Sequence, residues 1–135
     1  MSDLFYKSTR DSNAKIKSSE AIVKGIAPDG GLYVPEAVPQ IDLPQDDLCQ
    51  MDYPELALYI MRKFLTDFTE GELKYCIREA YDKKFDDPGV TPLVEKDNTF
   101  FLELFHGPTL AFKDLALSIL PHLLRVAVKK IDIDK

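Results

Sequence analysis

The chain has 135 residues, of which 45% are hydrophobic and 30% are charged, and its formal net charge is -6. This length and composition predict one modest hydrophobic core in a soluble, globular protein. The negative charge, with no Lys/Arg cluster longer than a pair, argues against nucleic acid and anionic membranes as partners. Small molecules or other proteins are the partners we expect.

The sequence shows no targeting, membrane-spanning or metal-binding pattern. It turns polar directly after Met1, and no apolar run approaches ~18 residues, so we expect a cytosolic protein. The only cysteines are Cys49 and Cys76, and neither has a second Cys or a His at metal-ligand spacing. We interpret both as reduced thiols, with Cys76 on the apolar face of a helix, and predict no metal site.

The first elements are short. Residues 18–24 predict a helix with Ser18 or Ser19 as its N-cap and Gly25 just beyond its C-terminus. A turn at residues 29–31, rich in glycine, leads into extended chain. The following segment, residues 35–52, contains several prolines and is expected to be irregular.

Two amphipathic helices are marked more clearly. The first has Asp52 as N-cap with Glu55 three residues later, and the second begins with a capping box of Thr69 and Glu72. Apolar residues recur at helical spacing in both, so both are expected to pack on a core. The predicted core faces comprise Leu56, Ile60 and Phe64 in the first helix, and Leu73, Cys76, Ile77, Ala80 and Tyr81 in the second.

Proline and glycine around residues 85–92 suggest a boundary between an N-terminal module, residues 1–88, and a second unit, residues 89–135. The second unit begins with two strands that flank the turn-prone pair Asp97-Asn98, which predicts a hairpin. A long apolar helix is predicted from about Ala111, and Pro121 should kink it or leave one backbone hydrogen bond unmade.

Lys113 stands where a Gly-Pro loop meets this helix. A lysine does covalent chemistry only as the neutral amine, and its ordinary pKa is ~10.4. Burial and the positive end of a helix dipole both lower that value, and both effects could reach Lys113 beside Phe112 in the first helical turn. A lone lysine at a helix start is far more often solvated surface. The apolar strand, loop and helix around Lys113 favour a functional site instead.

The loop before Lys113 offers further groups. His106 could act as an acid or base or stack on a ring, and Thr109 could cap the helix or contact a ligand. Exposed backbone N–H groups at a helix start can hold an anion. His122 is interpreted as a surface or core residue, and the pair Asp86-Asp87 as solvated loop charge with no assigned role. No catalytic triad, P-loop or dinucleotide-binding glycine pattern is present.

The stretch ELFHGPTLAFKD, residues 103–114, resembles the cofactor-lysine motif of bacterial and fungal threonine synthases, a family of pyridoxal-phosphate (PLP) enzymes. The segments YKSTR, residues 6–10, and SEAIVKGIAPDGGLYVP, residues 19–35, are similar to the opening of that family. FDDPGVTPL, residues 85–93, is similar to its linker. The resemblance covers nearly the whole chain.

This resemblance implies an α/β chain: a threonine-synthase N-terminal module followed by a partial strand-loop-helix piece of a PLP fold type II domain. The implied reaction converts O-phosphohomoserine and water to threonine and phosphate. Lys113 would be the Schiff-base lysine and proton carrier, with Phe112 against the cofactor. His106 and Thr109 would shape the substrate pocket. Arg10 would pair with a substrate phosphate or form a structural salt bridge.

Three departures from the family pattern limit what we expect of this chain. Asp11 stands where the family has Gly, Pro121 is unusual in its helix, and the sequence stops at Lys135 before the segments that cradle the phosphate and contact the pyridine nitrogen. We therefore expect an inactive N-terminal fragment of a threonine synthase. The alternatives are a threonine-synthase-like phospho-lyase on a related phospho-substrate, and a non-catalytic binding module that self-associates through an uncovered apolar face.

Overall fold

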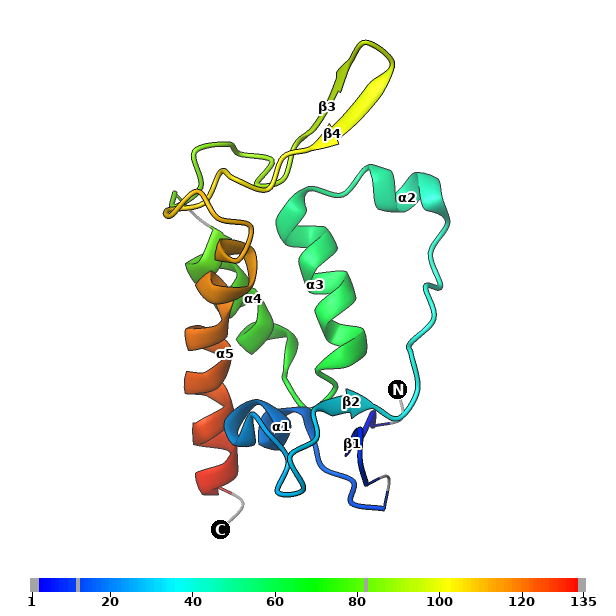
Figure 1. Ribbon diagram of the computed structural model, residues 1–135, viewed down its shortest axis with the longest axis vertical. Helices are drawn as coiled ribbons and strands as arrows, with labels where there is room; N and C mark the ends of the chain where they lie inside the picture. The colour runs from blue at the N-terminus through cyan, green and yellow to red at the C-terminus, as the bar shows by residue number, and fades with distance from the viewer. Residues whose placement is uncertain (1–2, 12, 82, 134–135) are drawn as a thin grey trace.

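The computed structural model describes residues 3–11, 13–81 and 83–133. Helices pack side by side through the middle, and two small antiparallel sheets lie at opposite ends (Figure 1). No helix in these ranges is long and apolar enough to cross a bilayer. The elements in chain order are β1 (Tyr6–Ser8), α1 (Ser18–Lys24), β2 (Tyr33–Pro35), α2 (Gln45–Cys49), α3 (Tyr53–Phe64), α4 (Glu70–Tyr81), β3 (Leu93–Lys96), β4 (Thr99–Leu102) and α5 (Asp114–Ile133).

The core lies where α4 packs between α3 and α5. The predicted apolar face of α4 is confirmed for Leu73, Cys76, Ile77 and Ala80, all of which are buried. From α5 the buried residues are Ile119, Leu123 and Ala127. Burying a side chain such as Leu73 contributes about 1.5–3 kcal/mol. Burial also raises the pKa of the Cys76 thiol to about 11, so this cysteine acts as a small hydrophobic residue.

Both predicted capping boxes are confirmed. In α3 the Asp52 carboxylate accepts from the Glu55 N–H at 2.9 Å, and Glu55 accepts from the Asp52 N–H at 3.0 Å. Thr69 and Glu72 make the equivalent pair at the start of α4. These local bonds satisfy N–H groups that have no partner within the helix, so the helix starts can be read from sequence.

The apolar series predicted for α3 is only partly turned inward: Ile60 and Phe64 are half-buried. Ala57, Leu58 and Met61 pack against the core, whereas Leu56 is 36% exposed. Apart from Glu55, Arg62 and Lys63, the residues of α3 are apolar or aromatic. Helical spacing alone therefore permits more than one inward face. The packing partner α4 decides which one is used.

The start of α1 also differs from the prediction. Lys17 is the N-cap, and Ser18 and Ser19 are buried in the first turn. The Asp67 carboxylate, from the α3–α4 connection, accepts from the Ser18 hydroxyl and from the Ser19 N–H at 3.1 Å. Burial alone would raise the pKa of Asp67, but the bonds from Ser18 and Ser19 outweigh it and hold the pKa below its usual range. A distant carboxylate therefore replaces the local serine cap. Gly25 ends the helix as predicted, with φ of +69°.

The turn between α1 and β2 is confirmed. Gly30 has φ of +78°, and Asp29 accepts from the Ser8 hydroxyl and the Gly31 N–H, each at 2.8 Å. A Cβ on Gly31 would lie 2.1 Å from the Ser8 Oγ, so only glycine fits there. The short helix α2 falls in the segment expected to be irregular. A single helical turn is too short to show an apolar period, which is why the sequence did not reveal it.

The predicted hairpin is confirmed as β3–β4, with Lys96 paired to Thr99. Asp97 and Asn98 have φ of +51° and +59°, the left-handed pair that a two-residue hairpin turn of type I′ requires. Every residue of both strands is exposed. The hairpin therefore projects from the helices rather than covering them (Figure 1).

Candidate functional site

The loop of residues 106–113 connects the hairpin to α5 and folds back over the start of that helix. Leu110 has φ of +60°, and its N–H donates to the Gly107 carbonyl at 3.0 Å, which makes a tight turn. A Cβ on Gly107 would lie 2.4 Å from the Cβ of Asp114. Glycine is therefore required at position 107 by the close approach of loop and helix.

Asp114 holds this loop in place. Its side chain is buried, and its carboxylate accepts from the Thr109 N–H at 2.7 Å and the Thr109 hydroxyl at 2.6 Å. These bonds keep the pKa of Asp114 below its usual range. Sequence analysis expected Thr109 to cap the helix or contact a ligand, and gave Asp114 no structural role. In the structure Thr109 is the donor and the first residue of α5 is the acceptor.

Lys113 is the residue immediately before α5, which begins at Asp114 rather than at about Ala111. Its carbonyl accepts from the N–H groups of Ala116 and Leu117 at 3.1 and 2.8 Å, so its backbone is fixed to the first turn. Its side chain is exposed. The described residues thus hold the backbone of this lysine but do not bury its side chain, a point that the sequence left open.

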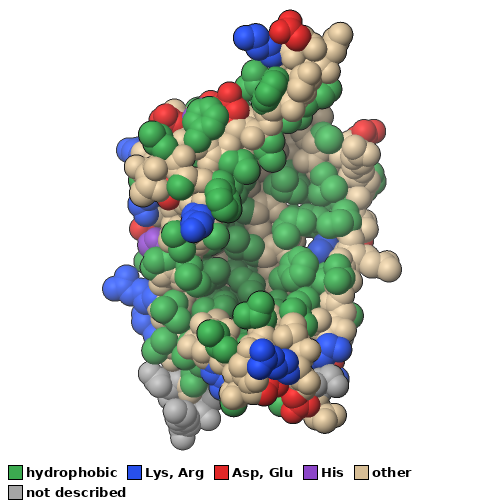
Figure 2. All heavy atoms as spheres, in the orientation of Figure 1, with side chains coloured by type: hydrophobic (Ala, Val, Ile, Leu, Met, Phe, Trp, Pro, Cys, Tyr) green, Lys and Arg blue, Asp and Glu red, His purple; other side chains and the backbone are tan. Residues whose placement is uncertain are grey.

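Exposed apolar residues lie next to Lys113 in sequence and follow it along α5. Phe112 is 64% exposed. Hydrophobic groups cover much of the face in view and surround a hollow (Figure 2). On α5 itself the large apolar residues that the structure shows as exposed recur at helical spacing after Lys113 and are Leu117, Leu120, Leu124 and Val128. We call these four residues the outer stripe. Pro121 lies inside α5, which continues past it to Ile133.

His106 lies at the entrance to the loop, with a carboxylate at each ring nitrogen. Nδ1 is 2.6 Å from Asp86, and Nε2 is 2.7 Å from Glu103. The hydrogen bonds with Glu103 and Asp86 raise the pKa of His106 above its ordinary value. Sequence analysis assigned Asp86 no role. Twenty residues separate it from His106, and no local pattern marks such a pair.

Arg10 is not brought to this loop. Its guanidinium donates to the Asp29 carbonyl at 3.0 Å, over the turn that precedes β2. The β1–β2 end of the molecule lies near the C-terminal part of α5, whereas Lys113 lies at the N-terminal end of that helix (Figure 1). Within the described residues, Arg10 and Lys113 therefore do not form one site.

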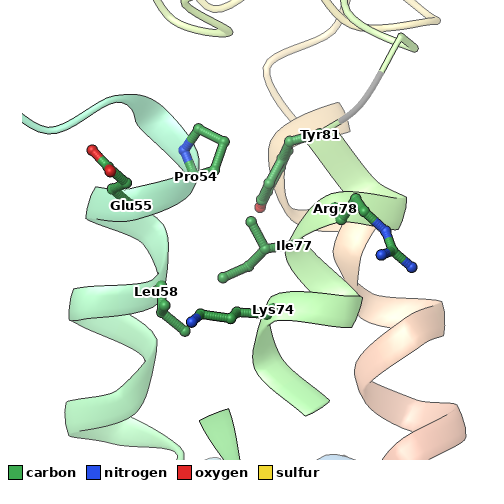
Figure 3. A pocket seen from close by; sticks show the side chains of 7 residues that line it. All are labelled: Pro54, Glu55, Leu58, Lys74, Ile77, Arg78 and Tyr81. Carbon is green, nitrogen blue, oxygen red and sulfur yellow. The ribbon is translucent and has the colours of Figure 1, made fainter. Parts of the chain in front are cut away.

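A separate recess of about 300 Å³ lies between α3 and α4, and all its lining residues come from these two helices. Leu58 and Lys74 face each other across it, with Ile77 and Tyr81 on the α4 side (Figure 3). The residues of the Lys113 loop do not line it. This recess could not be predicted from the sequence, because it forms only where α3 and α4 pack side by side.

Comparison with known proteins shows which family this chain belongs to. The family described as "Threonine synthase N terminus" matches residues 5–81. The chain belongs to the threonine synthase family. Threonine synthase of Saccharomyces cerevisiae is 41% identical over 128 residues, which cover 87% of this chain and 25% of that protein.

Solved threonine synthase structures agree. The PLP-bound threonine synthase from Brucella melitensis superposes with a TM-score of 0.84 at 35% identity, over 96% of this chain and 28% of that one. The yeast threonine synthase structure gives a TM-score of 0.86 at 37% identity, over 96% of this chain and 27% of that one. The chain thus has the α/β fold of these enzymes and spans about a quarter of their length.

Proposed function

We propose that this chain is the N-terminal part of a PLP-dependent threonine synthase, which converts O-phosphohomoserine and water to threonine and phosphate. The observation that carries the proposal is the presentation of Lys113. Its backbone is held by the first turn of α5 and by the adjoining Thr109–Asp114 bonds, while its amine stays exposed beside an apolar surface. Covalent attachment to a cofactor needs an amine that is held in position and within reach, and the burial that favours its neutral form would come from the rest of the enzyme covering this surface.

The residues present fit the attachment of PLP but supply only part of its site. Lys113 would hold the cofactor and carry protons at the substrate carbon atoms, and Phe112 would lie against it. Thr109 would shape the substrate side of the pocket through its position beside Lys113. When bound, PLP supplies an electron sink. Arg10 is left out of the proposed site because it lies at the other end of α5.

The outer stripe supports the same proposal. Apolar side chains along one side of a helix are costly to leave in water, and a larger synthase would cover them. We propose that residues 1–88 are the N-terminal module and residues 89–135 begin the PLP-binding domain. In that arrangement α5 contacts α4 on one side and the remainder of the enzyme on the other. We retain the cytosolic location as part of this proposal.

The decisive experiment uses a longer polypeptide that begins with this sequence and has the length of the synthases it resembles. Threonine and phosphate release from O-phosphohomoserine are measured for the parent protein and for Lys113→Ala. We expect loss of roughly 10²-fold or more in kcat, because Lys113 is the proposed proton carrier. Lys129→Ala, an exposed lysine on the same helix, is the matched control and should retain activity.

Two outcomes would count against the proposal. Full activity in Lys113→Ala would remove Lys113 from the reaction. Phosphate release without threonine would favour the phospho-lyase alternative, since the same cofactor chemistry can end in elimination. The 135-residue chain alone is expected to show no activity above its own Lys113→Ala variant, because the proposed site is incomplete in it.

A further inference from the structure

Two carboxylates contact the ring of His106, and one of them comes from a segment 20 residues away. Asp86 comes from the linker after α4, Glu103 directly follows β4, and His106 begins the loop that ends at Lys113. The His106 side chain is 14% exposed, against 26% for Glu103 and 72% for Asp86. The imidazole is therefore largely enclosed, and its two partners hold it from opposite sides.

Backbone bonds run between the same segments. The Asp86 N–H donates to the His106 carbonyl at 3.0 Å, and the Glu103 N–H donates to the Pro92 carbonyl at 3.0 Å. The linker is itself anchored: Phe85 and Val90 are buried, and Val90 adopts φ of +60°, which is rare for a β-branched residue. The ring of His106 thus attaches the start of the loop to a well-fixed part of the chain.

The chemistry of this arrangement favours the imidazolium. A neutral imidazole has one donor and one acceptor nitrogen, so it would leave one of the two carboxylates facing a lone pair. The protonated ring donates at both nitrogens, and each bond is then charge-assisted. Among the described residues, the charged groups bonded to the ring are Asp86 and Glu103, whereas Asp114 on α5 is bonded to Thr109.

Two other roles for this cluster fit the geometry less well. The carboxylates bind opposite ring nitrogens and do not converge on one point, and the described residues contain no group of three or more such side chains that could hold a metal ion. Both nitrogens are also occupied, so neither is free to contact a substrate. Sequence analysis suggested an acid, a base or a pocket residue at His106, and the geometry indicates another function.

We propose that His106 is a positioning residue: as an imidazolium it ties Asp86 of the linker and Glu103, directly after β4, to the loop that presents Lys113. The ordering of the loop by His106 is argued from its contacts with Asp86 and Glu103 alone. Only the consequence for catalysis rests on the proposed function of Lys113. The loop should be most ordered when His106 is charged and should loosen when the ring loses its proton or its carboxylate partners.

The pH dependence follows from the direction of the shift. Because the pKa of His106 is raised in the folded chain, its contribution is fully present below the ordinary histidine value and is lost as pH rises through the raised value. The loop is therefore expected to loosen toward alkaline pH, not toward acid.

The test is amide hydrogen exchange in the 135-residue chain, read at two loop amides: the Thr109 N–H donates to Asp114 of α5, and the Leu110 N–H donates to the Gly107 carbonyl. Protection is expressed relative to an unstructured peptide at the same pH. We expect His106→Leu to lower protection at these amides by ~10-fold or more while the amides of α4 remain protected. His106→Asn and His106→Gln, which each keep one amide donor near one nitrogen position, should retain part of the protection.

The carboxylates are tested separately, since Asp86→Asn and Glu103→Gln each remove one charge. Each should lower the midpoint of the His106 ring titration, measured by NMR. The chain contains only one other histidine, His122, whose ring lies 6.2 Å from that of Tyr75 and serves as reference in the same sample. Protection of the loop in the parent chain should fall across the same pH range in which His106 titrates.

Two results would overturn the proposal. One is unchanged loop protection in a folded His106→Leu variant. The other result needs no variant: the loop protection of the parent chain does not change across the pH range in which His106 titrates. Lys113→Ala should leave the loop protection and the His106 titration unchanged, because the Lys113 side chain makes no contact in the His106–Asp86–Glu103 cluster. If that variant also proves active in the longer enzyme, the proposed function fails, but the positioning role of His106 is unaffected.

Discussion

The two sides of α5 carry similar residues in different surroundings. Ile119, Leu123 and Ala127 are buried against the rest of the helical core, whereas Leu120 and Leu124 of the outer stripe are 45% and 38% exposed. Both sides show helical spacing, so the sequence predicts an apolar helix without indicating which side is already covered. The contrast separates the side of α5 that stabilises this chain from the side that we propose a larger synthase would cover.

The largest expected change in stability comes from a matched pair of substitutions, one on each side of α5. Leu123→Ala should lower the free energy of unfolding of the 135-residue chain by about 2–5 kcal/mol, because it leaves a cavity in the core. Leu120→Ala, three positions earlier on the same helix, should change it by no more than about 0.5 kcal/mol. Urea denaturation measures both. Equal effects would show that the outer stripe is covered in solution, for instance by a second copy.

The next prediction concerns the fold of the Lys113 loop over α5. Gly107→Ala should destabilise the chain by about 1–3 kcal/mol, because its Cβ would overlap Asp114. Gly71→Ala is the matched control, since Gly71 is the second residue of α4 and a Cβ there meets nothing within 4 Å. That substitution should be neutral or slightly stabilising, because alanine loses less backbone freedom on folding than glycine. Thermal or urea denaturation measures the stability of both variants. Unchanged stability of Gly107→Ala would refute the close approach of Gly107 to Asp114.

A smaller effect is expected at Asp67, which caps α1 from a distant position. Asp67→Ala should cost about 0.5–2 kcal/mol, because Ser18 and Ser19 lose their acceptor. Since the pKa of Asp67 is lowered in the folded chain, its contribution is present above the ordinary aspartate value and is lost as pH falls through the lowered one. The difference between parent and variant should therefore shrink in acid. Asp46→Ala, at the exposed start of α2, is the control and should show little change at any pH.

The weakest expected effect is self-association of the 135-residue chain through the outer stripe. Light scattering should show a concentration-dependent increase in mass, and Leu117→Lys with Leu120→Lys should reduce it, because both side chains are exposed and apolar. The same double substitution in a longer synthase should impair its assembly instead. A parent chain that stays monomeric at all concentrations would show that the exposed stripe alone is insufficient for association.

Local patterns in the sequence predicted the elements whose stabilising bonds are also local. The capping boxes of α3 and α4 lie within four residues, and the Asp97-Asn98 turn needs only a backbone that tolerates positive φ. The motif around Lys113 was also visible without the structure, because a family resemblance depends on residues that are contiguous in sequence. Such features do not depend on what the rest of the chain does.

Packing between distant segments decided the remaining features. Asp67 caps α1 across 48 residues, Asp86 meets His106 across 20, and contact with α4 selects the inward face of α3. The start of α5 at Asp114 depends on the loop that folds back onto that carboxylate. The sequence by itself thus determined the starts of α3 and α4 and the hairpin, and it singled out Lys113 as the candidate cofactor lysine. Only tertiary structure decided which side chains hold that lysine in place, because a carboxylate or imidazole can bond any partner that the fold brings within about 3 Å.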